Sequence, residues 1–112
     1  MTYQEINKMI ESFGLPYAYY QFPEGTKQAT PFVVFYFVNS DDLYAENSNY
    51  QRIEVLNIEL YTSEKDFDIE GVIEEFLSDN GLSYYKEENY INSEKMWQIA
   101  YEMEVMINGK QS

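Results

Sequence analysis

The middle of the chain, from Arg52 to Leu77, combines an apolar strand pattern with an amphipathic helix pattern that follows it directly. Its first half carries aliphatic residues in close succession: Ile53, Val55, Leu56, Ile58 and Leu60. Its second half carries apolar residues at the i, i+3, i+4, i+7 and i+8 positions of a helix with one buried face: Ile69, Val72, Ile73, Phe76 and Leu77. Only the short polar segment 61–66 separates the two halves, so the helix is expected to fold back onto the sheet. The stretch predicts an α+β layer.

The strand half contains apolar residues on both of its faces. Ile53 and Val55 share one parity, whereas Leu56, Ile58 and Leu60 share the other. Because successive side chains of a strand point to opposite faces, both sets cannot face one core. We therefore predict a β-bulge near Val55 and Leu56, or a strand that exchanges one covered face for the other.

Patterns along the rest of the chain predict one more helix and four more strands. Thr2 and Glu5 fit a capping box that opens an amphipathic helix over 4–13, which Gly14 can end. Further strands are expected at 17–22, at 32–38, from 82 to 85 and at 96–107. The expected order is α-β-β-β-α-β-β, with a mainly antiparallel sheet of four to five strands and both helices packed on it. At 112 residues, the chain is expected to form a single α+β domain over 1–112.

The last expected strand shows the strictest alternation in the chain. Trp97, Ile99 and Tyr101 alternate with Gln98 and Ala100. A period of two is typical of a strand with one buried face and one solvated face. We expect the first set to face a helix and the second set to face away from it.

The composition excludes several classes of function. The chain has 20 Asp and Glu against 7 Lys and Arg, a formal net charge of −13, and such a surface repels nucleic-acid phosphates and anionic membranes. It has no Cys and no His, which removes the thiolate nucleophile, the commonest general base and the commonest transition-metal ligand. No apolar run is long enough to span a membrane and no export signal is present, so a soluble protein is expected.

Carboxylates are the only catalytic group present in quantity. Glu102 and Glu104 lie on the solvated face of the last expected strand, but pairs of this kind arise by chance among 20 acids. The acidic segment 39–49 lacks the Asp-x-Asp-x-Asp-Gly order of an EF-hand, which favours a solvated hairpin loop over a calcium site. We expect no enzyme activity, no metal and no cofactor.

Aromatic residues are numerous for so small a chain, with 12 Tyr and 7 Phe. Several tyrosines fall in polar segments, where core packing is not expected, and Tyr is enriched in protein interfaces. We therefore predict an interface with other subunits or with a partner protein. Its predicted residues are Asp41, Asp42, Leu43, Tyr44, Glu46, Tyr50 and Tyr90.

Five segments carry a resemblance to a known family: Gln4–Phe13, Pro31–Val33, Tyr50–Val55, Phe67–Leu77 and Met96–Ile107. In type and order they resemble the elements of the small neck and tail-completion proteins of long-tailed bacteriophages, the tail-terminator group especially. The resemblance spans nearly the whole chain and lies in the pattern of elements. It implies an α+β subunit that closes into a ring, expected to be hexameric, at the head-proximal end of the tail tube. There the ring stops tube polymerisation and joins the tail to the head connector. No catalytic residues come with the resemblance.

The partners implied by the resemblance are other copies of the chain, the tail-tube protein and the head connector, without specific nucleic-acid binding and without a membrane. The implied location is the tail or neck of the virion, after assembly in the bacterial host cytoplasm. Two other classes stay open: an acidic DNA mimic that inhibits a DNA-processing enzyme, and a generic protein-interaction module. A mimic would space its carboxylates along one face like phosphates, whereas the acids here are spread over both helices, the long loop and the last strand.

Overall fold

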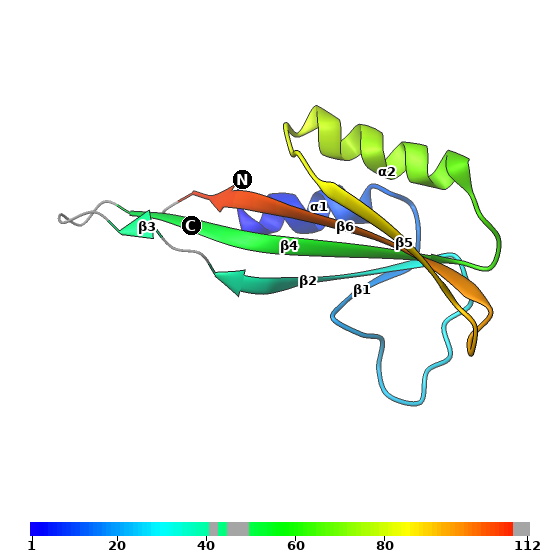
Figure 1. The fold of residues 1–112 in the computed structure, drawn as a ribbon. Coiled ribbons are helices and arrows are strands. Elements are labelled where there is room, and N and C mark those ends of the chain that lie inside the picture. Colours follow the sequence, from blue (N-terminus) through cyan, green and yellow to red (C-terminus); the bar gives the residue numbers. More distant parts are fainter. Residues whose placement is uncertain (41–42, 45–49, 109–112) are drawn as a thin grey trace.

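The chain folds into one sheet and two helices (Figure 1). The structure is a computed structural model that describes residues 1–40, 43–44 and 50–108, with the backbone alone described for 39–40, 43–44 and 50–51. Its elements are α1 (Tyr3–Glu11), β1 (Tyr17–Tyr19), β2 (Phe32–Ser40), β3 (Leu43–Tyr44), β4 (Tyr50–Thr62), α2 (Phe67–Asp79), β5 (Tyr85–Ile91) and β6 (Met96–Ile107). The predicted α+β class and element order are confirmed. The added element is β3, which falls in the segment expected to be a loop.

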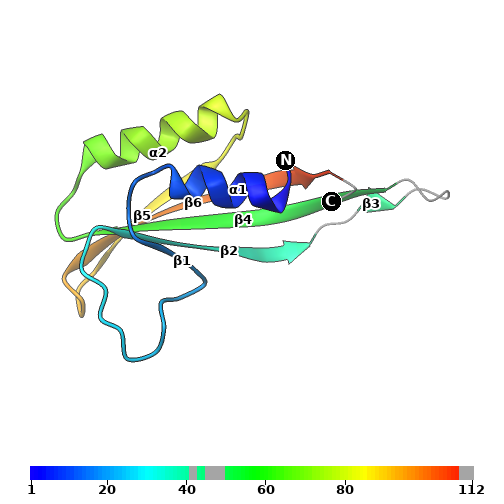
Figure 2. The ribbon, with the colours of Figure 1, turned by 180° about the vertical axis from the view of Figure 1, so that it is seen from behind.

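The sheet has the strand order β1-β2-β4-β6-β5, and β3 pairs with the beginning of β4. Neighbouring strands are antiparallel except β1 and β2, which run parallel. Both helices lie on the same side of the sheet, as Figure 2 shows from behind. The segment 20–31 runs on the opposite side. The sheet therefore has one face covered by helices and one face without a helix in the described part of the chain.

The hydrophobic core lies between the helices and the sheet. Its fully buried members come from both helices and from β2, β4 and β6: Ile6, Ile10, Val33, Leu56, Ile58, Leu60, Ile73, Leu77, Ile99 and Tyr101. Trp97 is half-buried and packs against this core, while the Gln98 side chain points to the other face and bonds Tyr61 there. The register predicted for the last strand is confirmed.

The first helix and first strand end where the backbone leaves regular geometry. The predicted capping box is present: Thr2 Oγ1 accepts from the Glu5 N–H at 3.1 Å, and Glu5 Oε1 accepts from the Thr2 N–H at 2.8 Å. Gly14 then turns the chain with φ of +80°. Strand β1 ends at Tyr19, earlier than predicted, because Tyr20 has φ of +70° and a left-handed residue cannot continue a strand.

The bulge predicted near Val55 and Leu56 is not in their own strand; the register shift lies in the neighbouring strand β2. Strand β4 pairs with β6 without interruption over 52–62. Strand β2 shifts register between Phe37 and Ser40. Phe37 pairs with Leu56 and Ser40 pairs with Glu54, so β2 has one extra residue in this interval. Because β4 itself keeps a strict alternation, Ile53 and Val55 face the helix-free side.

Helix α2 buries a face that differs from the predicted stripe. Ile73 and Leu77 are fully buried as expected, but Val72 is 46% exposed and Phe76 is only partly buried. The carboxylate-bearing Glu70 is buried in their place. The physical reason is ion pairing, because the side of α2 that carries Glu70 faces lysines outside the helix.

Two lysines surround the buried Glu70. Lys86 Nζ of β5 lies 2.8 Å from Glu70 Oε1, and Lys65, in the turn before α2, pairs with Oε2. Lys86 also lies 2.7 Å from Glu74 Oε2, and the same oxygen accepts from the Tyr101 hydroxyl at 2.8 Å. Since buried charges are tolerated only when they are paired, this ion cluster ties α2 to β5 and β6.

The ion cluster shifts the pKa values of its members. Burial alone would lower the pKa of Lys86, but the ion pairs with Glu70 and Glu74 outweigh burial and raise it. Burial alone would raise the pKa of Glu74, but the contacts with Lys86 and Tyr101 outweigh burial and lower it. Burial, reinforced by the Glu74 carboxylate, raises the pKa of the Tyr101 phenol. Lys86 and Glu74 are therefore charged, and Tyr101 neutral, at neutral pH.

Strand β5 runs over Tyr85–Ile91, so the strand predicted from 82 to 85 was wrong in extent. The Leu82 N–H donates to the Leu77 carbonyl at 2.9 Å and so belongs to the end of the helix. Polar residues fill β5 because alternate side chains reach the ion cluster: Lys86 joins it directly, and Glu88 pairs with Lys65. The remaining residues of β5 are exposed except Ile91, which is half-buried.

We predict that Leu77→Ala destabilises the fold by about 2–5 kcal/mol, because Leu77 is fully buried and its removal leaves a cavity. Val72→Ala on the same helix is the matched control, and its effect should stay within about 0.5 kcal/mol because Val72 is largely exposed. Urea denaturation of both variants measures the difference. Equal losses would contradict the observed orientation of α2.

We predict that Lys86→Met lowers the free energy of unfolding by about 1–3 kcal/mol near pH 7. The loss is smaller than for an isolated buried pair because Lys86 is partly exposed and Lys65 still faces Glu70. The raised pKa of Lys86 gives stability that is present below about pH 10 and lost above it. The lowered pKa of Glu74 gives stability that is present above about pH 4 and lost below it. The difference in the free energy of unfolding between wild type and variant should therefore be constant from about pH 5 to 9 and become smaller in acid. Chemical denaturation at a series of pH values measures it.

Candidate interaction surface

The helix-free face of the sheet consists of the side chains that alternate with the core residues. On β2 these are Phe32, Val34, Tyr36 and Val38; on β4 Ile53, Val55, Asn57, Glu59 and Tyr61; on β6 Gln98, Ala100, Glu102, Glu104 and Met106. Tyr85 and Glu87 of β5 complete it at one edge. This face differs in character along the strands, from aromatic at one end through polar to aliphatic at the other.

The aromatic end is covered by the segment 20–31. The ring of Tyr20 meets Tyr36 edge-on with centroids 5.8 Å apart, and Phe22 meets Phe32 in the same way at 5.4 Å. Phe32 in turn stacks on Tyr61 with centroids 4.9 Å apart. Edge-to-face and offset contacts of this kind add to the stabilisation from buried area, so this end of the face is closed by the chain itself.

Glu59 organises the polar centre of the helix-free face. Its carboxylate accepts from the Tyr36 hydroxyl at 3.0 Å, the Tyr61 hydroxyl at 2.7 Å and the Asn57 amide at 2.8 Å. Gln98 donates to the Tyr61 hydroxyl at 2.8 Å and links β6 to the same network. The carboxylate thus acts as a structural acceptor for three donors.

The two tyrosines of this network stay protonated at neutral pH. Burial, followed by the hydrogen bond to Glu59, raises the pKa of Tyr61. The same two causes in the same order raise the pKa of Tyr36. Both hydroxyls are therefore fixed as donors, and the arrangement provides hydrogen bonding without a group poised to exchange protons near pH 7.

A shallow hollow of about 370 Å³ opens above the polar centre and extends to β5. Its acidic lining comes from Glu59, Glu87 and Glu102, and polar side chains from β4, β5 and β6 fill the space between them. In the described part of the chain no group of three or more acidic side chains is placed to hold a metal ion. The acidic lining of the hollow favours contact with basic groups.

The aliphatic end of the helix-free face lies at the opposite end of the strands. Val38 is 45% exposed and Met106 is 53% exposed. Ile53 lies opposite Met106 in the sheet, and Val55 follows on the same face, both half-buried. A small patch of exposed aliphatic groups next to a polar rim is typical of a protein–protein contact.

The predicted interface residues fall into three groups. Asp41, Asp42 and Glu46 lie outside the described residues. Leu43, Tyr44 and Tyr50 are described by their backbone alone: Tyr44 pairs with Tyr50, and Leu43 pairs with Gln51, where β3 meets β4. Only Tyr90 has a described side chain. The prediction that these residues form an interface is untested by the structure.

Tyr90 is not brought together with the other predicted residues. It lies on β5 opposite Trp97, with the two ring centroids 5.2 Å apart, and its side chain is 43% exposed. Trp97 in turn pairs with Thr62 at the end of β4, whereas Tyr50 begins that strand. Because a strand rises about 3.3 Å per residue, Tyr90 and the β3–β4 hairpin lie at opposite ends of a sheet of about 40 Å.

The sequence reasoning missed the polar network at the centre of the helix-free face. The signal for it was present, because Asn57 and Glu59 interrupt the apolar strand at alternate positions and so share one face. What the sequence could not supply was the partners, since Tyr36 and Gln98 come from strands far apart along the chain.

The fold is shared with a chain from a solved structure titled "Virion of native gene transfer agent (GTA) particle". The two chains superpose with a TM-score of 0.62 over 96% of this chain and 91% of that chain, at 16% sequence identity. At this identity, the likeness shows the fold alone. No family model matches the sequence, and no curated protein matches it. Among the described residues, none of the helices is long and apolar enough to cross a membrane.

We predict that Glu59→Ala lowers the free energy of unfolding by about 1–3 kcal/mol, because two tyrosine hydroxyls and one amide lose their shared acceptor. Glu102→Ala on the neighbouring strand is the matched control. Its side chain is exposed, so its effect should stay within about 0.5 kcal/mol. Chemical denaturation compares the two variants, and a loss at Glu102 as large as that at Glu59 would argue against the network.

Proposed function

We propose that this chain is a structural subunit of a phage-like virion, and that it acts as a tail terminator. In this role, copies of the chain close into a ring, expected to be hexameric, at the head-proximal end of the tail tube. The ring stops tube polymerisation and offers a surface to the head connector. The observation that supports the proposal most directly is the fold shared with a chain of a virion particle over nearly the full length of both chains. The order of elements along the chain is consistent with the proposal.

The helix-free face suits a subunit that makes repeated contacts. A ring needs a heterologous interface, in which one patch of each copy meets a different patch of the next. The exposed aliphatic patch around Val38 and Met106 offers one such patch, and the acidic hollow beside Glu59 is a separate site that favours basic groups. A structural ring of this kind needs no catalytic residues.

The charge of the chain sets the conditions for assembly. A formal charge of −13 on each subunit makes copies repel one another, so contacts between them work against self-repulsion. The Debye length falls from about 10 Å at 0.1 M salt to about 3 Å at 1 M, which weakens that repulsion. An acidic ring also lets DNA pass without binding it, because phosphates are repelled.

The decisive experiment adds the purified protein to tail tubes that are still polymerising and measures tube lengths by electron microscopy. We expect capped tubes of limited length, with more complete capping at higher salt. Met106→Glu should reduce capping at least about tenfold, because it places a charge in the exposed aliphatic patch. Val72→Glu is the matched control, since Val72 is an exposed aliphatic residue on α2, on the other side of the sheet, and its change should leave capping intact.

The alternative function is a DNA mimic, and the helix-free face carries the carboxylates that such a mimic would need. Glu59, Glu87, Glu102 and Glu104 bring four carboxylates onto neighbouring strands of one face. If the protein fails to limit tube length but competes with DNA for a DNA-processing enzyme, the mimic replaces the terminator. If it caps tubes and leaves such enzymes unaffected, the terminator stands.

A further inference from the structure

Strand β6 has a partner strand along its full length on one side only. Strand β4 pairs with it over 52–62, whereas β5 pairs with it only as far as Tyr85, which lies opposite Glu102. In the described part of the chain, no strand pairs with 103–107 on the β5 side. An open edge of this kind is a template for another extended chain.

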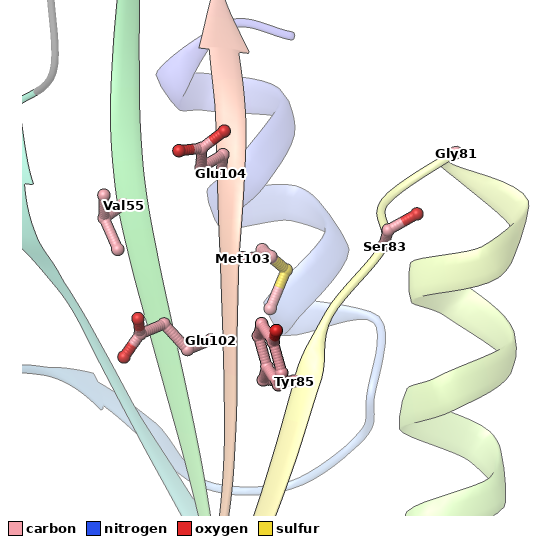
Figure 3. Close-up of a pocket in the computed structure, with 7 residues that line it drawn as sticks. All are labelled: Val55, Gly81, Ser83, Tyr85, Glu102, Met103 and Glu104. Atoms are coloured by element: carbon pink, nitrogen blue, oxygen red, sulfur yellow. The ribbon is translucent and has the colours of Figure 1, made fainter.

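The end of α2 explains why β5 does not continue along this edge. Gly81 has φ of +71°, and the Leu82 N–H donates to the carbonyl of Leu77, so the chain leaves the helix in a tight turn. Figure 3 shows Gly81 and Ser83 set apart from β6 and the chain reaching that strand only at Tyr85. The separation is therefore built into the helix terminus.

A hollow of about 500 Å³ lies between the two segments. Gly81, Ser83 and Tyr85 line one side of it, and Glu102, Met103 and Glu104 of β6 line the other. The hollow extends over β6 to Val55 of β4, and Figure 3 shows the carboxylates of Glu102 and Glu104 on that side of β6. Because neighbouring strands lie about 4.8 Å apart, a hollow beside an open edge can admit one extended chain.

The same edge already forms strand-like bonds with the first residue of the chain. The amino group of Met1 donates to the Met106 carbonyl at 2.9 Å, and the Asn108 N–H donates to the Met1 carbonyl at 3.0 Å. Because the N–H and C=O of alternate residues point to the same edge, the backbone groups of Glu104 point the same way. Glu104 thus lies between Met1 and Tyr85, on an edge that demonstrably accepts an extended backbone.

The side chains along this edge specify the partner. Glu102 and Glu104 are exposed on the helix-free face, while Met103 and Val105 are buried on the helix side. Among the described residues, no Lys or Arg lines the hollow. An added strand would therefore meet carboxylates at every second position on one of its faces, and Lys or Arg at alternate positions complements that pattern.

We propose that the edge of β6 at 103–105 binds an extended, basic segment of a partner polypeptide by strand addition. Backbone hydrogen bonds to this edge provide the attachment, and Lys or Arg side chains at alternate positions pair with Glu102 and Glu104. The open edge covers about three to five residues between Tyr85 and Met1, or roughly 10–17 Å of extended chain. This site is independent of the proposed role in a virion.

The test is a titration of isotope-labelled protein with the capped peptide Lys-Val-Lys-Val-Lys, followed by the chemical shifts of the backbone amides. We expect the largest shifts at Met103, Glu104 and Val105. A peptide of the same sequence with every backbone nitrogen methylated has the same charge but no N–H to donate along either edge, and it should bind at least about fivefold more weakly. Equal binding of both peptides, or shifts that centre elsewhere, overturns the proposal.

Two sets of variants separate charge from backbone pairing. The double variant Glu102→Gln/Glu104→Gln should raise the Kd about three- to tenfold at low salt, whereas Glu11→Gln/Glu75→Gln changes the net charge equally on the helices and should leave the Kd unchanged. Glu104→Pro also removes the N–H that points to the edge, so it should bind more weakly than Glu104→Gln. The amide spectrum reports whether each variant is folded. Equal effects of the two double variants would make the binding non-specific and overturn the proposal.

Discussion

The pairing of β4 with β6 over 52–62 is the constraint on which the rest of the structure depends. Because side chains alternate between the two faces of a strand, this one register decides which residues of both strands face the helices. A slip of one residue would bury the Glu59 network and expose Leu56, Ile58 and Leu60. Both helices pack on the face that the register makes apolar, and the other face is left free for contacts.

The two faces of the sheet differ in how their polar groups are satisfied. On the helix side, Glu70 is fully buried and depends on lysines from β5 and from the turn before α2. On the helix-free side, Glu59 binds neutral donors and stays partly exposed. The first arrangement fixes the orientation of α2, because a buried carboxylate without its lysines is costly. The second holds β2, β4 and β6 at a defined spacing and leaves the surrounding surface acidic.

In the proposed strand addition, the acidic surface and the open edge of β6 supply the contacts with another protein. The net charge of −13 opposes contact between copies and favours contact with basic groups. Hydrogen bonds along a strand edge depend little on side chains, so in the proposed strand addition the carboxylates beside that edge select the partner. The sheet provides the rigid scaffold, and the groups on its surface provide the proposed contacts.

The sequence by itself determined the elements whose pattern is local. The capping box of α1, the alternation of β6 and the strand-then-helix order of β4 and α2 all follow from spacings of two to four residues. The tertiary structure alone decided which side of α2 is buried, that the bulge lies in β2, and that the polar residues of β5 form a strand. It also placed Tyr90 far from the β3–β4 hairpin with which the sequence had grouped it. The physical reason is the same in each case. An ion pair or a strand pairing brings together residues that are distant along the chain, and the spacing of residues within one segment does not predict those partners.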